Sequence, residues 1–142
     1  MTAEVLARKL AVLERYLEDL RSHQGKSVEE VQRDPYEIER LLEFVVQVAV
    51  DIISHDLAER GTTPVSYRDG FLRAADAGIL PEALAARLAD AAGLRNILVH
   101  MYETIDYEIV AASVSPALEG FGAFLDRYRR RLAKWEERGE ES

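Results

Sequence analysis

Apolar side chains recur at helical spacing near the start of the chain. Five leucines follow one another at alternating steps of four and three residues: Leu6, Leu10, Leu13, Leu17 and Leu20. This spacing keeps an apolar stripe on one face of a helix, so we predict a helix over residues 3–21. Ser27 followed by Glu30 is typical of a capping box and predicts a short helix over residues 27–33.

A second long helix is predicted from Asp34 to about Arg60, with Asp34 as its N-cap, Pro35 in its first turn and Gly61 as its stop. Residues 44–53 are apolar on nearly every side of this helix. So wide an apolar surface must be covered from more than one direction. A second copy of the chain can supply one cover, so we predict a two-fold dimer that buries part of residues 44–53.

Three further helices are predicted in the second half of the chain: residues 66–75, a helix that opens at Pro81 and continues through the nineties, and residues 104–112. A last helix is expected to begin at Ser115-Pro116. Gly93 costs a helix about 1 kcal/mol relative to Ala, so we expect a close helix crossing or a bend there. We predict an all-α, up-down helical bundle of about five to six helices, the shorter of the predicted segments continuing into or fraying from their neighbours. It forms a single domain over residues 1–142, with a frayed tail after about residue 136.

Composition and charge narrow the possible functions. The absence of cysteine excludes disulfides and thiolate catalysis and fits the cytoplasm. Eighteen basic against twenty-six acidic residues give a net charge of −8, the wrong sign for a general nucleic-acid binder. No signal-peptide pattern opens the chain, and the longest apolar run is too short to span a bilayer. We therefore expect a soluble, cytoplasmic protein with no membrane partner.

Polar side chains that can take part in catalysis lie on one side of the helix predicted around residues 93–103. At about 100° per residue, Arg95, Asn96, His100 and Tyr102 fall within an arc of roughly 160°. Arginine offers phosphate a permanent charge and a bidentate fork, and histidine transfers protons near neutral pH. Asn96 is an auxiliary candidate, because it lies one turn before His100 and can hold its imidazole or donate to phosphate. These residue types suit metal-independent cleavage of RNA.

Metal and cofactor chemistry have weak support in the sequence. The chain has no His-Glu-x-x-His or Cys/His spacing and no glycine-rich phosphate loop, so we expect neither a metal nor a cofactor. A polar row at four-residue steps, which includes Asp51 and His55, has two interpretations. It is either a solvated stripe, or it faces the Arg95–His100 side and brings Asp51 there as an auxiliary residue.

A basic cluster on the last predicted helix is likewise open to two interpretations. Its members are Arg127, Arg129, Arg130, Arg131 and Lys134. Such runs are commonly solvated or satisfy the end of a helix. A secondary role in contacting RNA phosphates or an acidic partner also remains open.

The spacing Arg-x-x-x-x-His-x-Tyr, formed by Arg95, His100 and Tyr102, resembles the signature of the HepT-like ribonuclease toxins within the HEPN group. The resemblance extends to Tyr16-Leu17 and to residues 64–69 (PVSYRD), 78–81 (GILP) and 93–96 (GLRN). It implies an endoribonuclease toxin of a toxin–antitoxin pair, with Arg95 and His100 as catalytic residues in a composite cleft between two protomers.

The same resemblance implies regulation. In HepT-like toxins the residue matching Tyr102 receives AMP from an MntA-like nucleotidyltransferase antitoxin, which adds negative charge where RNA must bind. The alternative function is a non-catalytic helical module that binds a nucleotide or a nucleotidyltransferase. The overall acidity of the chain favours that alternative, and the intact Arg95, His100 and Tyr102 set favours the enzyme.

Overall fold

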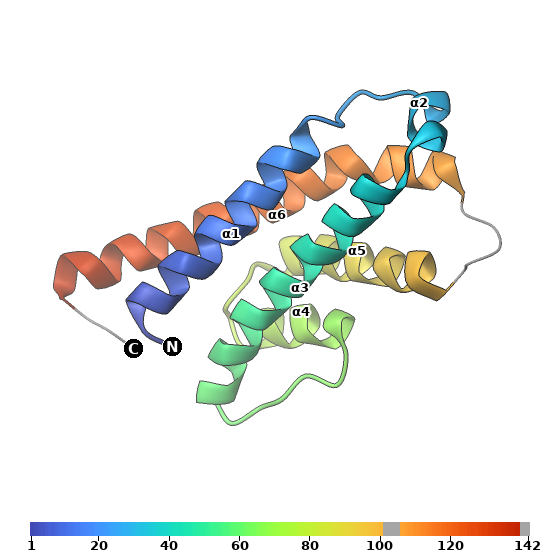
Figure 1. The fold of residues 1–142 in the computed structure, drawn as a ribbon. Helices are drawn as coiled ribbons and strands as arrows, with labels where there is room; N and C mark the ends of the chain where they lie inside the picture. The colour runs from blue at the N-terminus through green and yellow to red at the C-terminus, as the bar shows by residue number, and fades with distance from the viewer. Residues whose placement is uncertain (101–105, 140–142) are drawn as a thin grey trace.

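The computed structural model describes residues 1–100 and 106–139, and the side chains of all of these except residues 95–100. In the described residues the chain forms six helices and no strand (Figure 1): α1 (Ala3–Arg21), α2 (Val28–Arg33), α3 (Tyr36–Glu59), α4 (Tyr67–Asp76), α5 (Glu82–His100) and α6 (Tyr107–Arg138). The predicted all-α fold is therefore confirmed.

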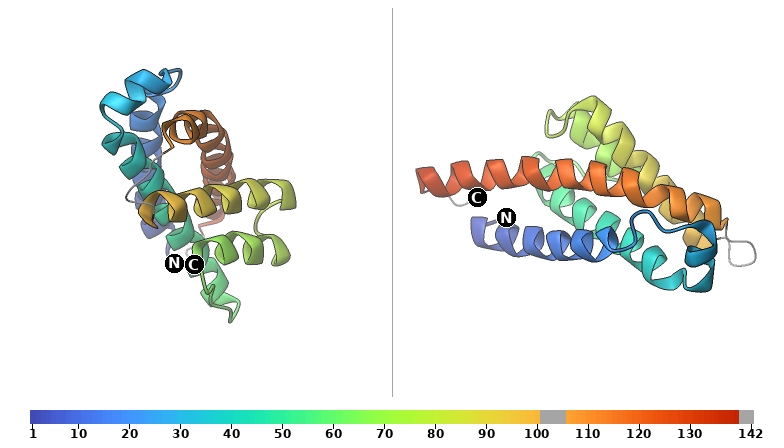
Figure 2. Two further views of the ribbon diagram at one scale, coloured as in Figure 1. Left: turned by 90° about the vertical axis from the view of Figure 1, so that its right-hand side faces the viewer. Right: turned by 90° about the horizontal axis from the view of Figure 1, so that it is seen from above.

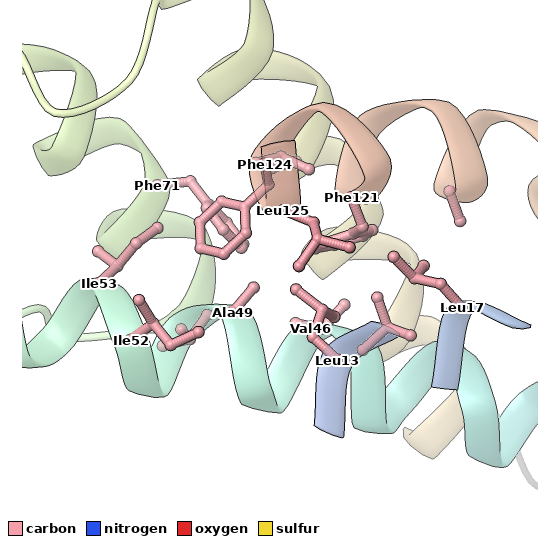
Figure 3. Packing of buried hydrophobic residues seen from close by; sticks show 14 of the residues in the cluster. Leu13, Leu17, Val46, Ala49, Ile52, Ile53, Phe71, Phe121, Phe124 and Leu125 are labelled. Carbon is pink, nitrogen blue, oxygen red and sulfur yellow. The ribbon is translucent and has the colours of Figure 1, made fainter. Parts of the chain in front are cut away.

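The helices pack around a single core. α1 lies along α6, α3 packs against α1, and α4 and α5 form a pair that covers α3 and α6 (Figures 1 and 2). Figure 3 shows how these elements meet: Phe71 of α4 and Phe121 of α6 come together over α3, with ring centroids 6.2 Å apart. Leu13 and Leu17 bring the predicted leucine stripe of α1 into the same cluster.

Local capping signals are mostly confirmed. Ser27 and Glu30 form the predicted capping box at the start of α2. The Asp69 amide donates to the Ser66 hydroxyl at 3.0 Å at the start of α4. Asp34 as the N-cap of α3 is wrong, because its amide donates to the Val31 carbonyl at 3.2 Å and the residue closes α2 instead.

The predicted break at Ser115-Pro116 is also wrong. α6 continues through Pro116, although the ring removes the amide that would bond to the carbonyl four residues earlier. Val114 and Phe121 are buried on the two sides of this position, so packing holds the helix together across the proline. The predicted start at Thr104 lies outside the described residues. α6 begins after Asp106, whose carboxylate accepts hydrogen bonds from the next helical amides.

The apolar surface of α3 is mostly covered within one protomer. Val45, Ala49, Ile52 and Ile53 each have 0% exposure, because α1, α4, α5 and α6 all contact this helix. Most of the cover that residues 44–53 need is therefore supplied by the helices of the same chain. Phe44 and Val48 remain half-buried, so a dimer that buries part of residues 44–53 stays a prediction.

The close helix crossing expected at Gly93 occurs at another glycine. Within the described part of the chain, a Cβ placed on Gly93 would meet no atom within 4 Å. A Cβ on Gly120 of α6 would lie 3.2 Å from Leu88 Cδ2 of α5. α5 and α6 therefore pack closely at Gly120, where a side chain larger than hydrogen would press on Leu88.

α6 is also the one described helix that is long and apolar enough to cross a bilayer. Many of its apolar positions, among them Leu118, Phe121 and Phe124, are buried against the other helices. The core helix of a soluble bundle has the same length and composition, so this property is weak evidence for a membrane span.

Candidate active site

The last two turns of α5 carry three of the predicted site residues. Arg95, Asn96 and His100 lie on one uninterrupted helix that ends at His100. Asn96 and His100 are separated by one turn, and the backbone positions of Arg95 and His100 are about 140° apart around the axis. Tyr102 lies outside the described residues. The structure thus supplies the helical frame that the motif requires, while the contacts of these side chains stay a prediction.

This end of α5 extends from a firmly packed base. Ala85, Leu88 and Ala92 of α5 are buried against the neighbouring helices. Arg68 of α4 lies 3.5 Å from Asp90, and Arg87 donates to Glu119 of α6 at 2.9 Å. These exposed ion pairs join α5 to both of its neighbours. The direction of its last turns is set mainly by the buried packing of its base against α4 and α6.

An apolar groove of about 360 Å³ lies beside this end of α5. Its walls include Leu42 and Val46 of α3, Leu94 of α5, and Ile109 and Phe121 of α6. Ile109, at the rim of this groove, is 44% exposed. Because Leu94 directly precedes Arg95, the apolar groove borders the motif.

Asp51 lies on a different side of α3. It is half-exposed, forms an ion pair with Lys9 of α1, and lies 3.7 Å from His55 Nε2. On the α3 helix its position is about 180° from that of Leu42, which faces the apolar groove beside α5. Within one protomer the structure does not bring Asp51 to the α5 side of the helix. Its auxiliary role stays a prediction, and its surroundings favour the solvated stripe.

At the opposite end of α6 lies a feature that the sequence showed only in part. Six cationic side chains surround a groove of about 410 Å³: Arg60, Arg127, Arg130, Arg131, Lys134 and Arg138. We call this the basic groove. Arg129, which the sequence grouped with it, points elsewhere and forms an ion pair with Glu14 of α1. Arg60 could not be assigned from sequence alone, because only the fold brings the end of α3 beside α6.

A buried cluster fixes one wall of the basic groove. Asp56 is 2% exposed and accepts hydrogen bonds from the Tyr128 hydroxyl at 2.6 Å and from Arg131 Nη2 at 2.9 Å. Burial, with the charge and hydrogen bond of Asp56, raises the pKa of the Tyr128 phenol far above its ordinary value, so the phenol stays a donor. The Arg131 guanidinium also lies 4.5 Å from the Trp135 ring centroid. Arg131 is therefore held in place by both neighbours.

Comparison with known proteins settles the family. The model of the Ribonuclease HepT-like family matches residues 13–128. The chain belongs to the HepT-like ribonucleases. The resemblance inferred from the motif residues is thereby confirmed.

Similar proteins include two nucleases. The HepT-like chain is 29% identical over 138 residues to the tRNA nuclease HepT of Aphanizomenon flos-aquae, covering 94% of this chain and 93% of the relative. It is 33% identical over 86 residues to the mRNA nuclease HepT of Shewanella oneidensis, covering 60% of this chain and 65% of that protein.

A solved structure shares the fold. It is a tri-AMPylated HEPN toxin of Shewanella oneidensis in complex with an MNT antitoxin. The TM-score is 0.78 at 25% identity, over 89% of this chain and 97% of that one. The family match spans α5 and the apolar groove but ends at residue 128, so four of the six cations of the basic groove follow it.

Proposed function

We propose that this chain is a metal-independent endoribonuclease and the toxin of a toxin–antitoxin pair, with Arg95 and His100 as its catalytic residues. The observation that carries the proposal is their shared placement on the last turns of one continuous helix, in a chain that belongs to a ribonuclease family. A helix at this point holds the two residues about 140° apart, so a phosphate can lie between them.

The proposed chemistry moves two protons. His100 takes the proton of the ribose 2′-hydroxyl, whose oxygen attacks the adjacent phosphorus, and an acid protonates the leaving oxygen as its bond to phosphorus breaks. Arg95 stabilises the charge on the phosphorane oxygens through bidentate hydrogen bonds. Asn96, one turn before His100, holds the imidazole or donates to the phosphate. No metal ion or cofactor is needed for these steps.

One histidine does not readily serve as both base and acid in a single turnover. A two-fold dimer supplies a second His100 to a composite cleft. We place its contact at the apolar groove and the exposed Ile109, because this surface borders the motif and includes Val46 of the predicted α3 surface in its wall. Self-association there brings the two α5 ends near one another, as the chemistry requires.

Control by a nucleotidyltransferase antitoxin completes the proposal. The Tyr102 hydroxyl attacks the α-phosphorus of ATP, an oxygen–phosphorus bond forms, and pyrophosphate leaves. The attached AMP brings about one negative charge to the place where the RNA phosphate binds. The solved relative supports this step, since it is an AMPylated toxin bound to an MNT antitoxin. A Tyr102→Phe variant should cleave RNA and escape neutralisation by ATP and the antitoxin.

We place this activity in the cytoplasm. The substrate is RNA, and a chain without cysteine is suited to a reducing compartment. Tyr102 modification also requires ATP, which the cytoplasm supplies.

The decisive test is incubation of the purified protein with RNA, with and without a chelator. Cleavage should be unchanged by the chelator and should fall by about 10²–10⁴-fold in His100→Ala. His55→Ala is the matched control, because His55 is an exposed histidine of α3 whose described contact is Asp51. Wild-type cleavage by His100→Ala would end the catalytic proposal.

A further inference from the structure

We infer that the basic groove is an RNA-binding site separate from the cleavage site, and that it holds the phosphate backbone of a substrate long enough to reach both. The inference deepens the proposed ribonuclease function and rests on it for the identity of the polyanion. Its structural basis is the concentration of charge: six of the eighteen basic residues of an acidic chain surround one groove.

The spacing of the cations along α6 suits the phosphate backbone of an extended nucleic-acid strand. Arg130, Lys134 and Arg138 follow one another at four-residue steps on α6, so their positions rise by about 6 Å each along the axis. That rise is comparable with the distance between neighbouring phosphates on a nucleic-acid strand. The five α6 cations occupy an arc of about 100°. An extended polyanion lying along this face meets several charges in succession.

The surroundings cancel only part of the positive charge of the groove. Asp56 offsets the charge of Arg131, with which it forms an ion pair, and Glu59 is paired with the N-terminal ammonium at 2.7 Å. Arg130 and Lys134 are exposed and form no hydrogen bond or ion pair with the described part of the chain. These two side chains are therefore available to a ligand.

The groove has a preformed frame. Arg127 donates to the Ile79 carbonyl at 2.7 Å, and Arg60 donates to the Ala77 carbonyl at 3.2 Å. Together with the Asp56–Arg131 pair, these bonds fix three guanidinium groups, one at the end of α3 and two on α6. Because the fixed groups lose little side-chain freedom on binding, an anion meets a site that is largely organised in advance.

The groove is far from the motif. From Tyr107 at the start of α6 to Arg130 the helix rises about 35 Å, and Figure 2 shows the two ends of α6 at opposite sides of the molecule. A tetranucleotide bound at the end of α5 is too short to reach the groove of the same protomer, whereas a folded RNA of tRNA size is long enough. The geometry therefore favours structured or long RNA over short fragments.

An acidic protein surface is the competing ligand. The regular four-residue row and the predominance of arginine, whose fork matches phosphate oxygens, favour a phosphate backbone. The test below makes a protein ligand one of its outcomes.

Binding of labelled tRNA and of a labelled tetranucleotide should be measured in the intact protein, with His100→Ala present throughout so that the RNA is not cut. The groove variant is Arg130→Gln with Lys134→Gln. The matched control is Arg15→Gln with Arg129→Gln, which removes the same charge from exposed positions outside the groove. Circular dichroism checks that each variant keeps its helices.

We expect the groove variant to bind tRNA more weakly by on the order of tenfold, and its salt dependence to lose about two from the slope of log Kd against log salt. Tetranucleotide binding and the control variant should be unchanged. The inference would be overturned if the groove variant bound tRNA as tightly as the His100→Ala protein without the groove substitutions, or if the control variant lost as much tRNA affinity as the groove variant.

Two further outcomes separate this inference from others. A groove variant that binds tRNA normally but no longer binds a nucleotidyltransferase antitoxin would show that the groove docks protein, and would overturn the RNA assignment. Groove-dependent tRNA binding by a protein that cleaves no RNA would refute the proposed nuclease function and leave the binding site standing.

Discussion

The two ends of α6 differ in almost every property that matters to a nucleic-acid ligand. At its N-terminal end lie the last turns of α5 and the apolar groove, with exposed Ile109 at its rim. In its C-terminal half lies the basic groove, with six cations around it. Cleavage requires a few side chains in fixed positions, whereas affinity for RNA grows with the number of phosphates neutralised. An acidic ribonuclease can therefore place these two tasks at different ends of one helix.

The two ends also owe their geometry to different forces. The motif end is set by helix packing, through the buried face of α5 and the tight contact at Gly120. At the basic end, one wall of the groove depends on a single buried carboxylate, Asp56, which holds Arg131 and Tyr128. Removing a single interaction should therefore disturb the basic end more than the motif end.

The largest expected effect comes from Asp56→Ala. This substitution leaves the Arg131 guanidinium without its partner beside a buried phenol, and we expect a loss of about 3–5 kcal/mol in the free energy of unfolding. Asp51→Ala, which breaks the exposed pair with Lys9, should cost less than about 1 kcal/mol. Urea unfolding of both variants measures this. Equal losses would show that Asp56 has no special part in the basic end.

Arg95→Lys should have the next largest effect. Lysine keeps the charge and loses the bidentate fork, so we expect cleavage to fall by roughly 10²–10³-fold while the affinity for long RNA changes little. Single-turnover rate constants and Kd values on the same RNA give both quantities. A variant that cleaves like the wild type would place the phosphate contact on another residue.

Ile109→Asp examines the apolar groove as a dimer surface. A carboxylate buried at the contact is costly, so we expect at least a tenfold weaker dimer and a parallel loss of cleavage. Leu72→Asp is the control, because Leu72 is 39% exposed on α4 and does not line the apolar groove. Light scattering that finds the Ile109→Asp protein as dimeric as the control would move the interface elsewhere.

A pair of glycine substitutions should have the smallest effect. Gly93→Ala removes a weak helix former where a Cβ meets no described atom within 4 Å, so we expect a gain of about 1 kcal/mol in stability. Gly120→Ala should gain less or lose stability, because its Cβ would press on buried Leu88 at 3.2 Å. Thermal unfolding compares them. A loss in Gly93→Ala that appears only in the dimer would reveal a close crossing between protomers at this glycine.

The fold was predictable from sequence wherever its signals are local. The leucine stripe of α1 and the capping box at Ser27 need only residues within one or two turns. The predictions at Asp34 and Pro116 were wrong because a competing interaction won at each position. Asp34 closes α2 and so does not cap α3. At Pro116, packing on both sides of the proline outweighs the missing hydrogen bond, and the helix continues.

For the candidate site, only the helical placement of part of the motif followed from local sequence. Helical periodicity places Arg95, Asn96 and His100 on one segment, since only neighbouring residues decide it. The surroundings of Asp51 depend on Lys9, which is forty-two positions away in sequence, and the basic groove depends on Arg60 meeting α6. Contacts of this kind exist only after the chain has folded, so no local sequence pattern predicts them.

The central claim is that cleavage and RNA affinity are separated between the two ends of α6. It is tested most directly by measuring Kd and the single-turnover cleavage rate at saturating protein, on one tRNA, for His100→Ala and for the Arg130→Gln, Lys134→Gln variant. We predict that His100→Ala keeps its affinity and loses cleavage, and that the groove variant loses affinity and cleaves at the wild-type rate once saturated. A groove variant whose saturated rate falls as far as that of His100→Ala would contradict the account.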